Sequence, residues 1–427
     1  MNRKFIISGR HKLSGEYPVQ GNKNAALPLI AAALLSSAPV RLHNVPRIVD
    51  VENLLRLIES LGVSVEWEEG TLMLDPGSLD STTLAPDLTE KLRGSVLLLG
   101  VLASRVEEIS SAMPGGCSIG SRTFDAHWSV FRAAGFEVEE SRRAVRLRKV
   151  RSVDHPRVYL EESSVTATEN GLLLFASLGS GVIENPAREP HVLSLIDFLR
   201  QLGCEIELHP LYYRIRRGID GGQGEVDFQV PADYIDAGTI AIAAAVTDSR
   251  IVLKGARIDD LVGISNVLRR FGVTFEEAGT DSIVVSRSEA ITNPARVTVG
   301  LWPSFPTDLA SLVIVLATQG AGLCLIHDWM YEARMFFIDK LVRMGARITM
   351  CDPHRVLVQG PTLLQGTQLE SPDIRAGMAL VVAGLCAEGT TTIEHAEVIM
   401  RGYEGVAERL RRIGADVRAD SDGGNQL

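Results

Sequence analysis

The sequence has few cysteines, and none of them are spaced for disulfide or metal chemistry. The five are widely spread, odd in number and form no C-x-x-C pair: Cys117, Cys204, Cys324, Cys351 and Cys386. This distribution is typical of proteins in a reducing cytosol and offers no framework for a metal centre. We therefore expect a cytoplasmic protein without structural disulfides.

The sequence also lacks a long hydrophobic run and an excess of basic residues. The longest apolar stretch, AALPLIAAALL, contains a proline and is shorter than the roughly 20 residues that a membrane-spanning helix needs. The first residues, MNRKFIISGRHKLSGEY, interrupt their short apolar run with Ser and Gly, unlike a secretory signal. The formal net charge of −10 argues against broad binding to nucleic acid or to an anionic membrane. We expect neither as a partner, and we predict no protein partner.

Signatures of cofactor chemistry are missing as well. No G-x-G-x-x-G follows a strand, and the chain has no P-loop, no zinc-type His/Cys spacing and no G-x-S-x-G. We expect a reaction that needs neither an organic cofactor nor a metal.

What the sequence does contain is a sixfold internal repeat. One phrase recurs, an apolar helix end followed by a glycine and an alternating strand, as in LIESLGVSVEW and FLRQLGCEIEL. Each glycine stands where a helix must stop, at a left-handed backbone position that a side chain would strain. These glycines lie about 70 residues apart, at Gly62, Gly135, Gly203, Gly272, Gly345 and Gly414. The chain is therefore predicted to consist of six units of nearly equal length.

A second sequence motif recurs between the copies of the glycine motif. It consists of short segments that are apolar all round, namely LPLIAAALL, SVLLLGVLA, NGLLLFASL, TIAIAAAVT, LASLVIVLA and MALVVAGLC. Such segments are typical of helices buried on every side. Five of the six are followed by a small-residue turn and a strand pattern. Each unit is therefore predicted to contain a buried helix, a strand, an amphipathic helix and further strand.

Six such units are too many for one hydrophobic core of ordinary size. A length of 427 residues predicts two or three domains. Two groups of three units, each wrapping sheets around buried helices, would satisfy the burial. The short polar stretches PVQGNKN and QVPADY are the expected crossings between the groups. We predict a discontinuous domain of residues 1–21 plus 232–427 and a continuous domain of residues 22–231, each with three repeats.

Chemistry-bearing residues stand where single repeats depart from the common pattern. Lys23, in GNKNAALP, precedes a buried helix, where a cation conflicts with the helix dipole unless an anion binds there. The alternative is a solvated lysine. Cys117 lies on the glycine-rich loop PGGCSIGSR, which is expected to act as a lid. Arg93 and Arg122 could make its thiol acidic and able to donate a proton or attack carbon, and the alternative is an idle exposed thiol.

Two further places carry acidic and basic groups. In WPSFPTD, Asp308 is either an N-cap, as Thr307 could also be, or a carboxylate preset as a general base. Arginines then stand at matching helix starts in later repeats. Together the cations are Lys23, Arg93, Arg122, Arg334, Arg375 and Arg401. On an acidic protein this set predicts a small polyanionic substrate. After the Cys117 loop come Asp125 and His127, and His127 is either functional or a surface residue of the next helix.

Several motifs in order resemble those of the UDP-N-acetylglucosamine enolpyruvyl transferases (1-carboxyvinyltransferases) of peptidoglycan synthesis. They are GNKNAALP, RLHNVPRIVDV, PGGCSIGSR, ATENGLLL, IENPAREP, DYIDAGT, FPTD, DIRAGMALVVAG and RGYE. The resemblance runs from about residue 5 to 418. It implies a two-domain inside-out α/β barrel with six βαβαββ-type repeats and an active site in the cleft between the domains. It also implies transfer of the enolpyruvyl group of phosphoenolpyruvate to the sugar 3-hydroxyl, with release of phosphate.

The resemblance implies a role for each residue that matches a family motif. Phosphoenolpyruvate would be held by Lys23, Arg122 and Arg401. The nucleotide sugar would be contacted by Asn24, Arg93, Thr307 and Asp308, and Asp125 is expected to bind substrate. Asp308 would remove the hydroxyl proton, and Cys117 would be the proton donor, the covalent partner of phosphoenolpyruvate and the site alkylated by fosfomycin. The closed site would be completed by Arg334, Asp373 and Arg375.

Six positions depart from the family pattern. The family has Ala, Pro, Gly, Arg, Gly and Asp where this chain has Asn22, Thr123, Thr166, Tyr234, Ser304 and Met400. Several of these changes flank segments that would grip the nucleotide sugar. The alternatives are therefore an enolpyruvyl transferase with another nucleotide or nucleotide-sugar acceptor, and an inactive binding or regulatory homologue. The intact Lys23, Cys117, Asp308 and Arg401 argue against the inactive homologue.

Overall fold

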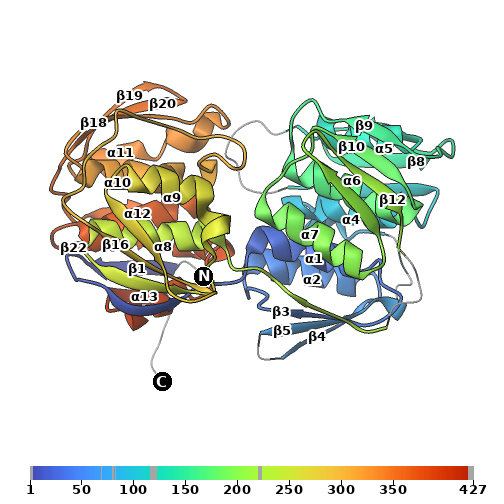
Figure 1. Ribbon diagram of the computed structural model, residues 1–427, viewed down its shortest axis with the longest axis horizontal. Helices are drawn as coiled ribbons and strands as arrows, with labels where there is room; N and C mark the ends of the chain where they lie inside the picture. Colours follow the sequence, from blue (N-terminus) through green and yellow to red (C-terminus); the bar gives the residue numbers. More distant parts are fainter. Residues whose placement is uncertain are drawn as a thin grey trace. The chain divides into compact units, whose positions relative to one another are not determined.

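The computed structural model describes residues 3–68, 70–78, 81, 83–115, 123–219 and 224–421. These residues form two compact units, each with its own hydrophobic core (Figure 1). Unit 1 contains the described parts of Met1–Gln20 and Ala232–Leu427, and unit 2 contains those of Gly21–Cys117 and Arg122–Pro231. The chain therefore crosses between the units at residues 20–21 and 231–232. From the sequence we placed these crossings at residues 21–22 and 231–232.

Unit 1 consists of three repeats of strand, buried helix, strand, amphipathic helix and two further strands. The first repeat contains β2 (Ser14–Pro18), α8 (Tyr234–Val246), β14 (Arg250–Lys254), α9 (Val262–Arg269), β15 (Val273–Glu277) and β16 (Ser282–Arg287). The second contains β17 (Arg296–Thr298), α10 (Ala310–Gln319), β18 (Gly322–His327), α11 (Ile338–Arg343), β19 (Arg347–Asp352) and β20 (Arg355–Gly360). The third contains β21 (Gln368–Glu370), α12 (Ile374–Cys386), β22 (Thr390–Glu394), α13 (Val406–Arg412), β23 (Asp416–Ser421) and β1 (Arg3–Ser8). The strands of each repeat form one four-stranded sheet.

Unit 2 repeats the same pattern. Its first repeat contains β13 (Val226–Gln229), α1 (Lys23–Ala33), β3 (Val40–His43), α2 (Val49–Glu59), β4 (Ser64–Glu68) and β5 (Thr71–Asp75). The second contains α4 (Val96–Leu102), β6 (Glu108–Ala112), α5 (Asp125–Ala133), β7 (Phe136–Glu140) and β8 (Ala144–Lys149), preceded by the short helix α3 (Pro86–Thr89). The third contains β9 (Arg157–Tyr159), α6 (Val165–Leu178), β10 (Gly181–Glu184), α7 (Pro190–Gln201), β11 (Glu205–His209) and β12 (Tyr212–Arg217). Among the described residues the second repeat forms a three-stranded sheet, β6-β8-β7.

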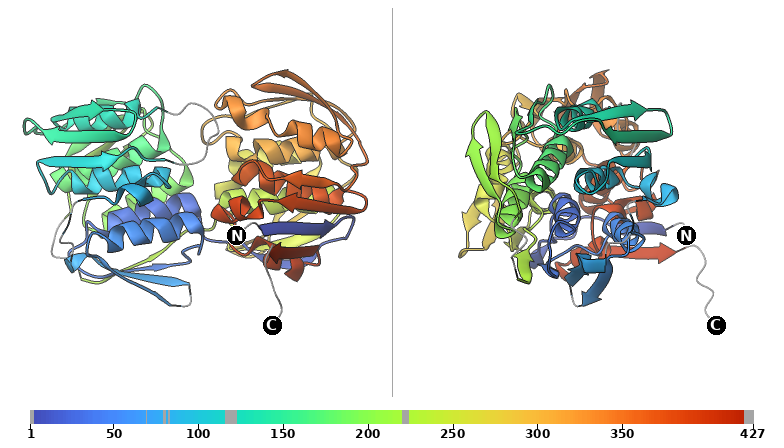
Figure 2. Two further views of the ribbon diagram at one scale, coloured as in Figure 1. Left: turned by 180° about the vertical axis from the view of Figure 1, so that it is seen from behind. Right: turned by 90° about the vertical axis from the view of Figure 1, so that its right-hand side faces the viewer.

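The six apolar segments form the six buried helices α1, α4, α6, α8, α10 and α12. Their side chains are Ala, Leu, Ile and Val for the most part, and nearly all of them are buried. In unit 1, α8, α10 and α12 contact one another and lie inside the sheets (Figure 1). The right-hand view of Figure 2 shows the corresponding interior helices of unit 2. The prediction that sheets wrap a bundle of buried helices is therefore confirmed.

The repeated glycines end the six amphipathic helices, as expected. All six have positive φ, with values of 96°, 90°, 93°, 89°, 95° and 97° in chain order. An L-residue with a side chain is strained in this region, so the helix ends there and the next strand begins. No helix among the described residues is long and apolar enough to cross a membrane.

Several strands were not visible in the sequence pattern, and three of them, β1, β2 and β13, pair with strands far away in the chain. β1 lies between β22 and β23, and β2 lies beside β14, so the first twenty residues complete two sheets of unit 1. β13 pairs in parallel with β3 across more than 180 residues of chain. Local patterns cannot reveal such partners, because a strand's neighbour is chosen by tertiary packing.

Candidate active site

The residues singled out in the sequence are divided between the two units. In unit 2 the structure describes Lys23, Asn24, Arg93, Asp125 and His127. In unit 1 it describes Thr307, Asp308, Arg334, Asp373, Arg375 and Arg401. Cys117 and Arg122 lie outside the described residues. That the two groups share one cleft stays a prediction.

Asp308 is the centre of the unit 1 group. It lies in the short 3-10 helix η4 (Thr307–Leu309), just before the buried helix α10. Its Oδ1 accepts a hydrogen bond from Nη2 of Arg334 at 3.1 Å, and its Oδ2 accepts from Nη2 and Nε of Arg375 at 2.8 and 3.1 Å. The arginine side chains are 1% and 7% exposed, whereas that of Asp308 is 28% exposed. The carboxylate thus faces outward from two buried guanidinium groups.

Arg375 is held in place by the start of α12. Asp373 is the N-cap of this helix, and its Oδ1 accepts the N–H groups of Arg375 and Ala376 at 2.8 and 3.0 Å. The guanidinium of Arg375 lies over the ring of Tyr403 at 5.3 Å from the ring centroid. Burial opposes its positive charge, but Asp308 and other neighbouring groups outweigh burial and raise the pKa of Arg375. The side chain is therefore a permanent cation.

Thr307 and Asp308 are tied to a residue that sequence reasoning missed. The Thr307 hydroxyl donates a hydrogen bond to Oδ2 of Asp328, which is fully buried at the end of β18. Oδ1 of Asp328 accepts from the N–H of Met330 at 2.9 Å. The only sequence signal was an acidic residue directly after the apolar strand LCLIH. From sequence alone this pattern looks like the end of a strand.

Arg401 ends the 3-10 helix η6 (Ala396–Arg401), and a buried polar network holds the residues that follow it. The Gln20 amide donates to the Gly402 carbonyl and accepts from the Glu404 N–H, both at 2.8 Å. Arg409 donates to Gln20 and to the buried carboxylate of Asp236, again at 2.8 Å. The sequence marked Gln20 only as part of a crossing, because its partners lie more than 380 residues away.

Beside this network, Asp233 caps the first helix of unit 1. It is buried and accepts the Ile235 N–H at 2.9 Å as the N-cap of α8. Burial is the main cause that raises the pKa of its carboxyl group to about 6, while the positive charge of Arg375 acts in the opposite direction. The pKa of the Asp233 carboxyl group therefore lies closer to neutral pH than that of an ordinary aspartate.

In unit 2, Lys23 opens α1 and has a nearly buried partner. Its Nζ lies 3.0 Å from Oδ2 of Asp50 on α2, with the two side chains 14% and 7% exposed. Asn22 is the N-cap of α1 and accepts the N–H groups of Asn24 and Ala25. The interpretation of Lys23 as a solvated lysine is therefore wrong. Asp50 offsets part of the conflict between the ammonium and the helix dipole.

Arg93 and the start of α5 form a second polar group in unit 2. Arg93 begins the 3-10 helix η2 (Arg93–Ser95), donates to the Thr123 carbonyl at 3.1 Å and lies over the Phe124 ring at 4.2 Å. Asp125, the first residue of α5, is exposed. Arg93 thus lies against the residues that lead into α5.

His127 is 1% exposed, so the expectation of a surface residue is wrong. The Asn170 amide donates to Nδ1 of His127 at 2.9 Å, and Nε2 lies 3.0 Å from the Thr166 hydroxyl. An accepting Nδ1 leaves the proton on Nε2, which then donates to Thr166. Burial first, and the charge of Arg93 second, lower the pKa of His127 to about 3. At physiological pH, His127 is therefore a neutral side chain whose hydrogen bonds link α5 to α6.

Four of the six departures from the family pattern have side-chain partners within their own unit, and one of them is Met400, whose Sδ accepts a hydrogen bond from Arg3 at 3.3 Å. Asn22 caps α1, and Thr166 accepts from His127. Tyr234 packs edge-on against Trp302, with ring centroids 5.9 Å apart, next to the turn that carries Asp308. Each of these changes is therefore accommodated in the surrounding packing.

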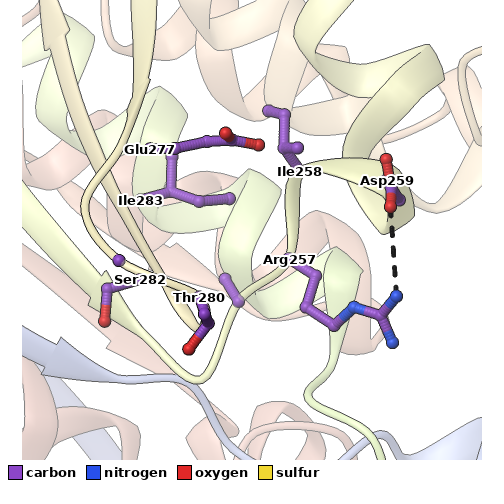
Figure 3. A pocket seen from close by; sticks show the side chains of 9 residues that line it. Arg257, Ile258, Asp259, Glu277, Thr280, Ser282 and Ile283 are labelled. Carbon is purple, nitrogen blue, oxygen red and sulfur yellow. Dashed lines mark ion pairs between the residues drawn. The ribbon is translucent and has the colours of Figure 1, made fainter.

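A hollow on unit 1, drawn in Figure 3, contains none of these residues. It is lined by Arg257, Asp259, Glu277, Thr280 and Ser282, among others. The ion pair that Figure 3 marks, between Arg257 and Asp259, spans 3.9 Å, and both side chains are largely exposed. These features are those of an ordinary surface depression between a hairpin and a turn.

Comparison with known proteins identifies the family. The model of the EPSP synthase (3-phosphoshikimate 1-carboxyvinyltransferase) family matches residues 7–410. The chain belongs to this enolpyruvyl transferase family. Two UDP-N-acetylglucosamine 1-carboxyvinyltransferases are similar over nearly their whole length. That of Bradyrhizobium diazoefficiens is 42% identical, covering 97% of each chain, and that of Borreliella burgdorferi is 38% identical, covering 97% of this chain and 98% of the relative.

The fold of this transferase is shared with solved members of the family. The enolpyruvyl transferase NikO from Streptomyces tendae is 25% identical in sequence and has a TM-score of 0.87. The match covers 98% of this chain and 99% of the NikO chain. The expected fold class of six repeats in two units is therefore confirmed. The expected enzyme class, an enolpyruvyl transferase, is confirmed as well.

Proposed function

We propose that this transferase moves the enolpyruvyl group of phosphoenolpyruvate to the 3-hydroxyl of UDP-N-acetylglucosamine and releases phosphate. The observation that carries the proposal is the full-length similarity, at 42% identity, to a relative named for this acceptor. The Asp308 carboxylate, bracketed by two buried arginines, supports it with a charged group of the required type. The reaction would be the first committed step of peptidoglycan synthesis, in the cytoplasm.

The proposed chemistry begins with addition to the double bond of phosphoenolpyruvate. Asp308 accepts the proton of the sugar hydroxyl, since a preset carboxylate can act as a general base on a hydroxyl. The hydroxyl oxygen attacks carbon 2, and Cys117 donates its proton to carbon 3. Loss of phosphate from carbon 2 and of a proton from carbon 3 then restores the double bond on the product.

The tetrahedral intermediate carries phosphate, carboxylate and diphosphate charges. Lys23, Arg122 and Arg401 are proposed to hold the phosphoenolpyruvate part, while Arg93 and Asn24 bind the nucleotide sugar. Arg334 and Arg375 would keep Asp308 in place, and a closed cleft between the units would exclude water. Cations preset in such a site stabilise developing negative charge far better than water does.

A second candidate is an enolpyruvyl transferase with another nucleotide or nucleotide-sugar acceptor. One observation favours it specifically. The Thr166 hydroxyl, at a position where the family pattern has glycine, is engaged by His127 at 3.0 Å at the start of α6. A side chain added at a helix start changes what that backbone can approach.

The test measures phosphate release from phosphoenolpyruvate with a panel of uridine nucleotides and nucleotide sugars. Release with UDP-N-acetylglucosamine is the expected result. Release only with another acceptor would overturn the first candidate in favour of the second. If no acceptor in the panel supports phosphate release, the protein is an inactive homologue.

The role of Cys117 is tested by inactivation with fosfomycin. The variant Cys117→Ser is expected to resist inactivation, because the hydroxyl is a far weaker nucleophile than the thiolate. Cys351→Ser is the matched control, since Cys351 is an exposed free cysteine of unit 1. Its inactivation should equal that of the unaltered protein. Unchanged inactivation of Cys117→Ser would contradict the assignment.

A further inference from the structure

We infer that Asp328 is a positioning residue that sets the Asp308–Arg334 ion pair, an inference that rests on the proposed function. Asp328 directly follows β18 and is fully buried. The proposed chemistry gives it no part. A buried carboxylate is costly unless its oxygens are hydrogen-bonded, so what these oxygens bind indicates what the residue does.

The two oxygens of Asp328 bind two different segments. Oδ2 accepts from the hydroxyl of Thr307, the residue before Asp308. Oδ1 accepts from the N–H groups of Met330 at 2.9 Å and Tyr331 at 3.4 Å. Tyr331 is the N-cap of the 3-10 helix η5 (Glu332–Met335), which carries Arg334.

These bonds close a ring around the ion pair. On one side the ring runs from Asp328 through Thr307 to Asp308. On the other side it runs from Asp328 through Tyr331 to Arg334. The 3.1 Å bond from Arg334 to Asp308 joins the two sides. One carboxylate therefore sets the relative position of the proposed base and its buried cation.

The backbone of Asp328 is itself anchored to a sheet. Its N–H donates to the His354 carbonyl at 2.8 Å, and Nδ1 of His354 donates to the Asp328 carbonyl at 2.7 Å. His354 lies in the turn between β19 and β20, and its own N–H donates to Asp352 at 2.9 Å. Support of this kind lets a residue hold its neighbours to within a fraction of an ångström.

The first experiment compares Asp328→Ala and Asp328→Asn in the phosphate-release assay. Asp328→Ala is expected to lower kcat about 10- to 100-fold, since a misplacement of about 1 Å costs up to about 100-fold. The KM for phosphoenolpyruvate should change less than about 2-fold, because its proposed ligands lie outside the ring. Asp328→Asn keeps an oxygen for the two N–H groups, and its amide can donate to Thr307, so it should restore most of kcat.

Asp248→Asn is the matched control for these variants. Asp248 is an acidic residue of unit 1 that is ion-paired with Lys12 and Arg287 away from the ring, and its variant should have an unchanged kcat. Wild-type kcat in Asp328→Ala would overturn the inference, as would equal losses in the Ala and Asn variants. So would a loss confined to the KM for phosphoenolpyruvate.

The second experiment asks whether Asp328 acts through Asp308. In an Asp308→Asn background, Asp328→Ala is expected to lower the residual kcat less than about 2-fold, since there is no base left to misplace. An equal further loss in both backgrounds would show that Asp328 acts by another route.

The third experiment does not depend on activity. Crystal structures of the wild-type protein and Asp328→Ala should differ in the Asp308–Arg334 contact, and an unchanged contact would overturn the inference. If Asp328→Ala does not fold, Thr307→Val breaks the same ring from its other end and should displace Asp308. If the wild-type protein releases no phosphate, the proposed function fails, and the crystal structures still decide the role of Asp328.

Discussion

At the scale of single residues, the carboxylate of Asp308 is shared by two guanidinium groups that solvent barely reaches. Buried ions need partners, because the desolvation of each costs several kcal/mol. Here the partners come from η5 and α12, which are separate elements of neighbouring repeats. Removing the central charge is therefore expected to affect both the proposed chemistry and the two arginines.

The variant Asp308→Asn tests this arrangement. The amide cannot take a proton from a hydroxyl, so kcat for phosphate release should fall about 10²- to 10⁴-fold. The melting temperature should fall as well, because Arg334 and Arg375 lose their counter-charge. A kcat within threefold of wild type would contradict the assignment of Asp308 as the base.

Asp233 gives stability a specific pH dependence. Its pKa of about 6 lies above the ordinary value of 3.8, so the folded protein holds a proton there that the unfolded chain releases between these values. Stability from this group is therefore present below about pH 4 and is lost as pH rises through 6. A pKa difference of about two units between the folded and unfolded states corresponds to roughly 3 kcal/mol of unfolding free energy.

Asp233→Asn should remove this dependence and keep the helix cap, since Asn is a good N-cap. The variant is expected to melt higher than wild type at pH 8, and the gain should disappear near pH 4. Melting temperatures of both proteins at these two pH values are the measurement. A gain that is equal at both pH values would mean that Asp233 does not titrate between them.

At the scale of elements, the six amphipathic helices end in the same way, and the sequence predicted these ends. The helix-terminating glycines all have φ near 90°. The strand β6, in contrast, was not predicted, because the segment EISSA has only a short and weak alternation. A helix end is a local property of one glycine, whereas a short strand is stabilised by its neighbours in the sheet.

Gly345→Ala measures the cost of losing one such end. Gly345 has φ of 95°, and a Cβ there would lie 3.8 Å from its nearest neighbour, so backbone strain is the dominant effect. The melting temperature should fall by an amount equivalent to about 1 kcal/mol. Gly224→Ala is the control, since Gly224 has open space and no positive φ, and it should leave the melting temperature unchanged. Equal effects of the two variants would refute the explanation.

At the scale of the whole molecule, the first and last strands of the chain pair in one sheet of unit 1. β1 lies between β22 and β23, with Arg3 opposite Ser421. In each unit, a backbone hydrogen bond joins the two segments of chain that cross between the units. Asp233 donates its N–H to the Gln20 carbonyl in unit 1, and Asn22 donates to the Pro231 carbonyl in unit 2, both at 2.8 Å. The first twenty residues therefore belong structurally with the last two hundred.

A circular permutant tests this arrangement. Paired residues on neighbouring strands lie about 5 Å apart, so residue 427 can be joined to residue 1 without stretching the sheet. New termini between Gly279 and Thr280 would open an exposed turn between β15 and β16. The permutant is expected to fold and to keep phosphate release within about threefold of wild type. Termini placed instead between Val284 and Val285, inside β16, should prevent folding. If the second permutant folds and the first does not, the pairing of β1 with β22 and β23 is contradicted.

The sequence alone determined the repeat number, the buried helices, their glycine ends and the family motifs. These are local properties, because they depend on the periodicity of apolar residues and on single backbone conformations within a few residues. It also marked Lys23, Asp308, Arg334 and Arg375 as charged departures from the repeats. It did not reveal which charges meet.

Only the tertiary structure decided the partners. Asp50 pairs with Lys23, Asp328 holds Thr307, and Gln20 supports the residues after Arg401. Each of these contacts joins segments that are brought together by the packing of whole helices and sheets. The energy of a buried charge depends on groups within a few ångströms in space, and distance along the chain does not report that proximity.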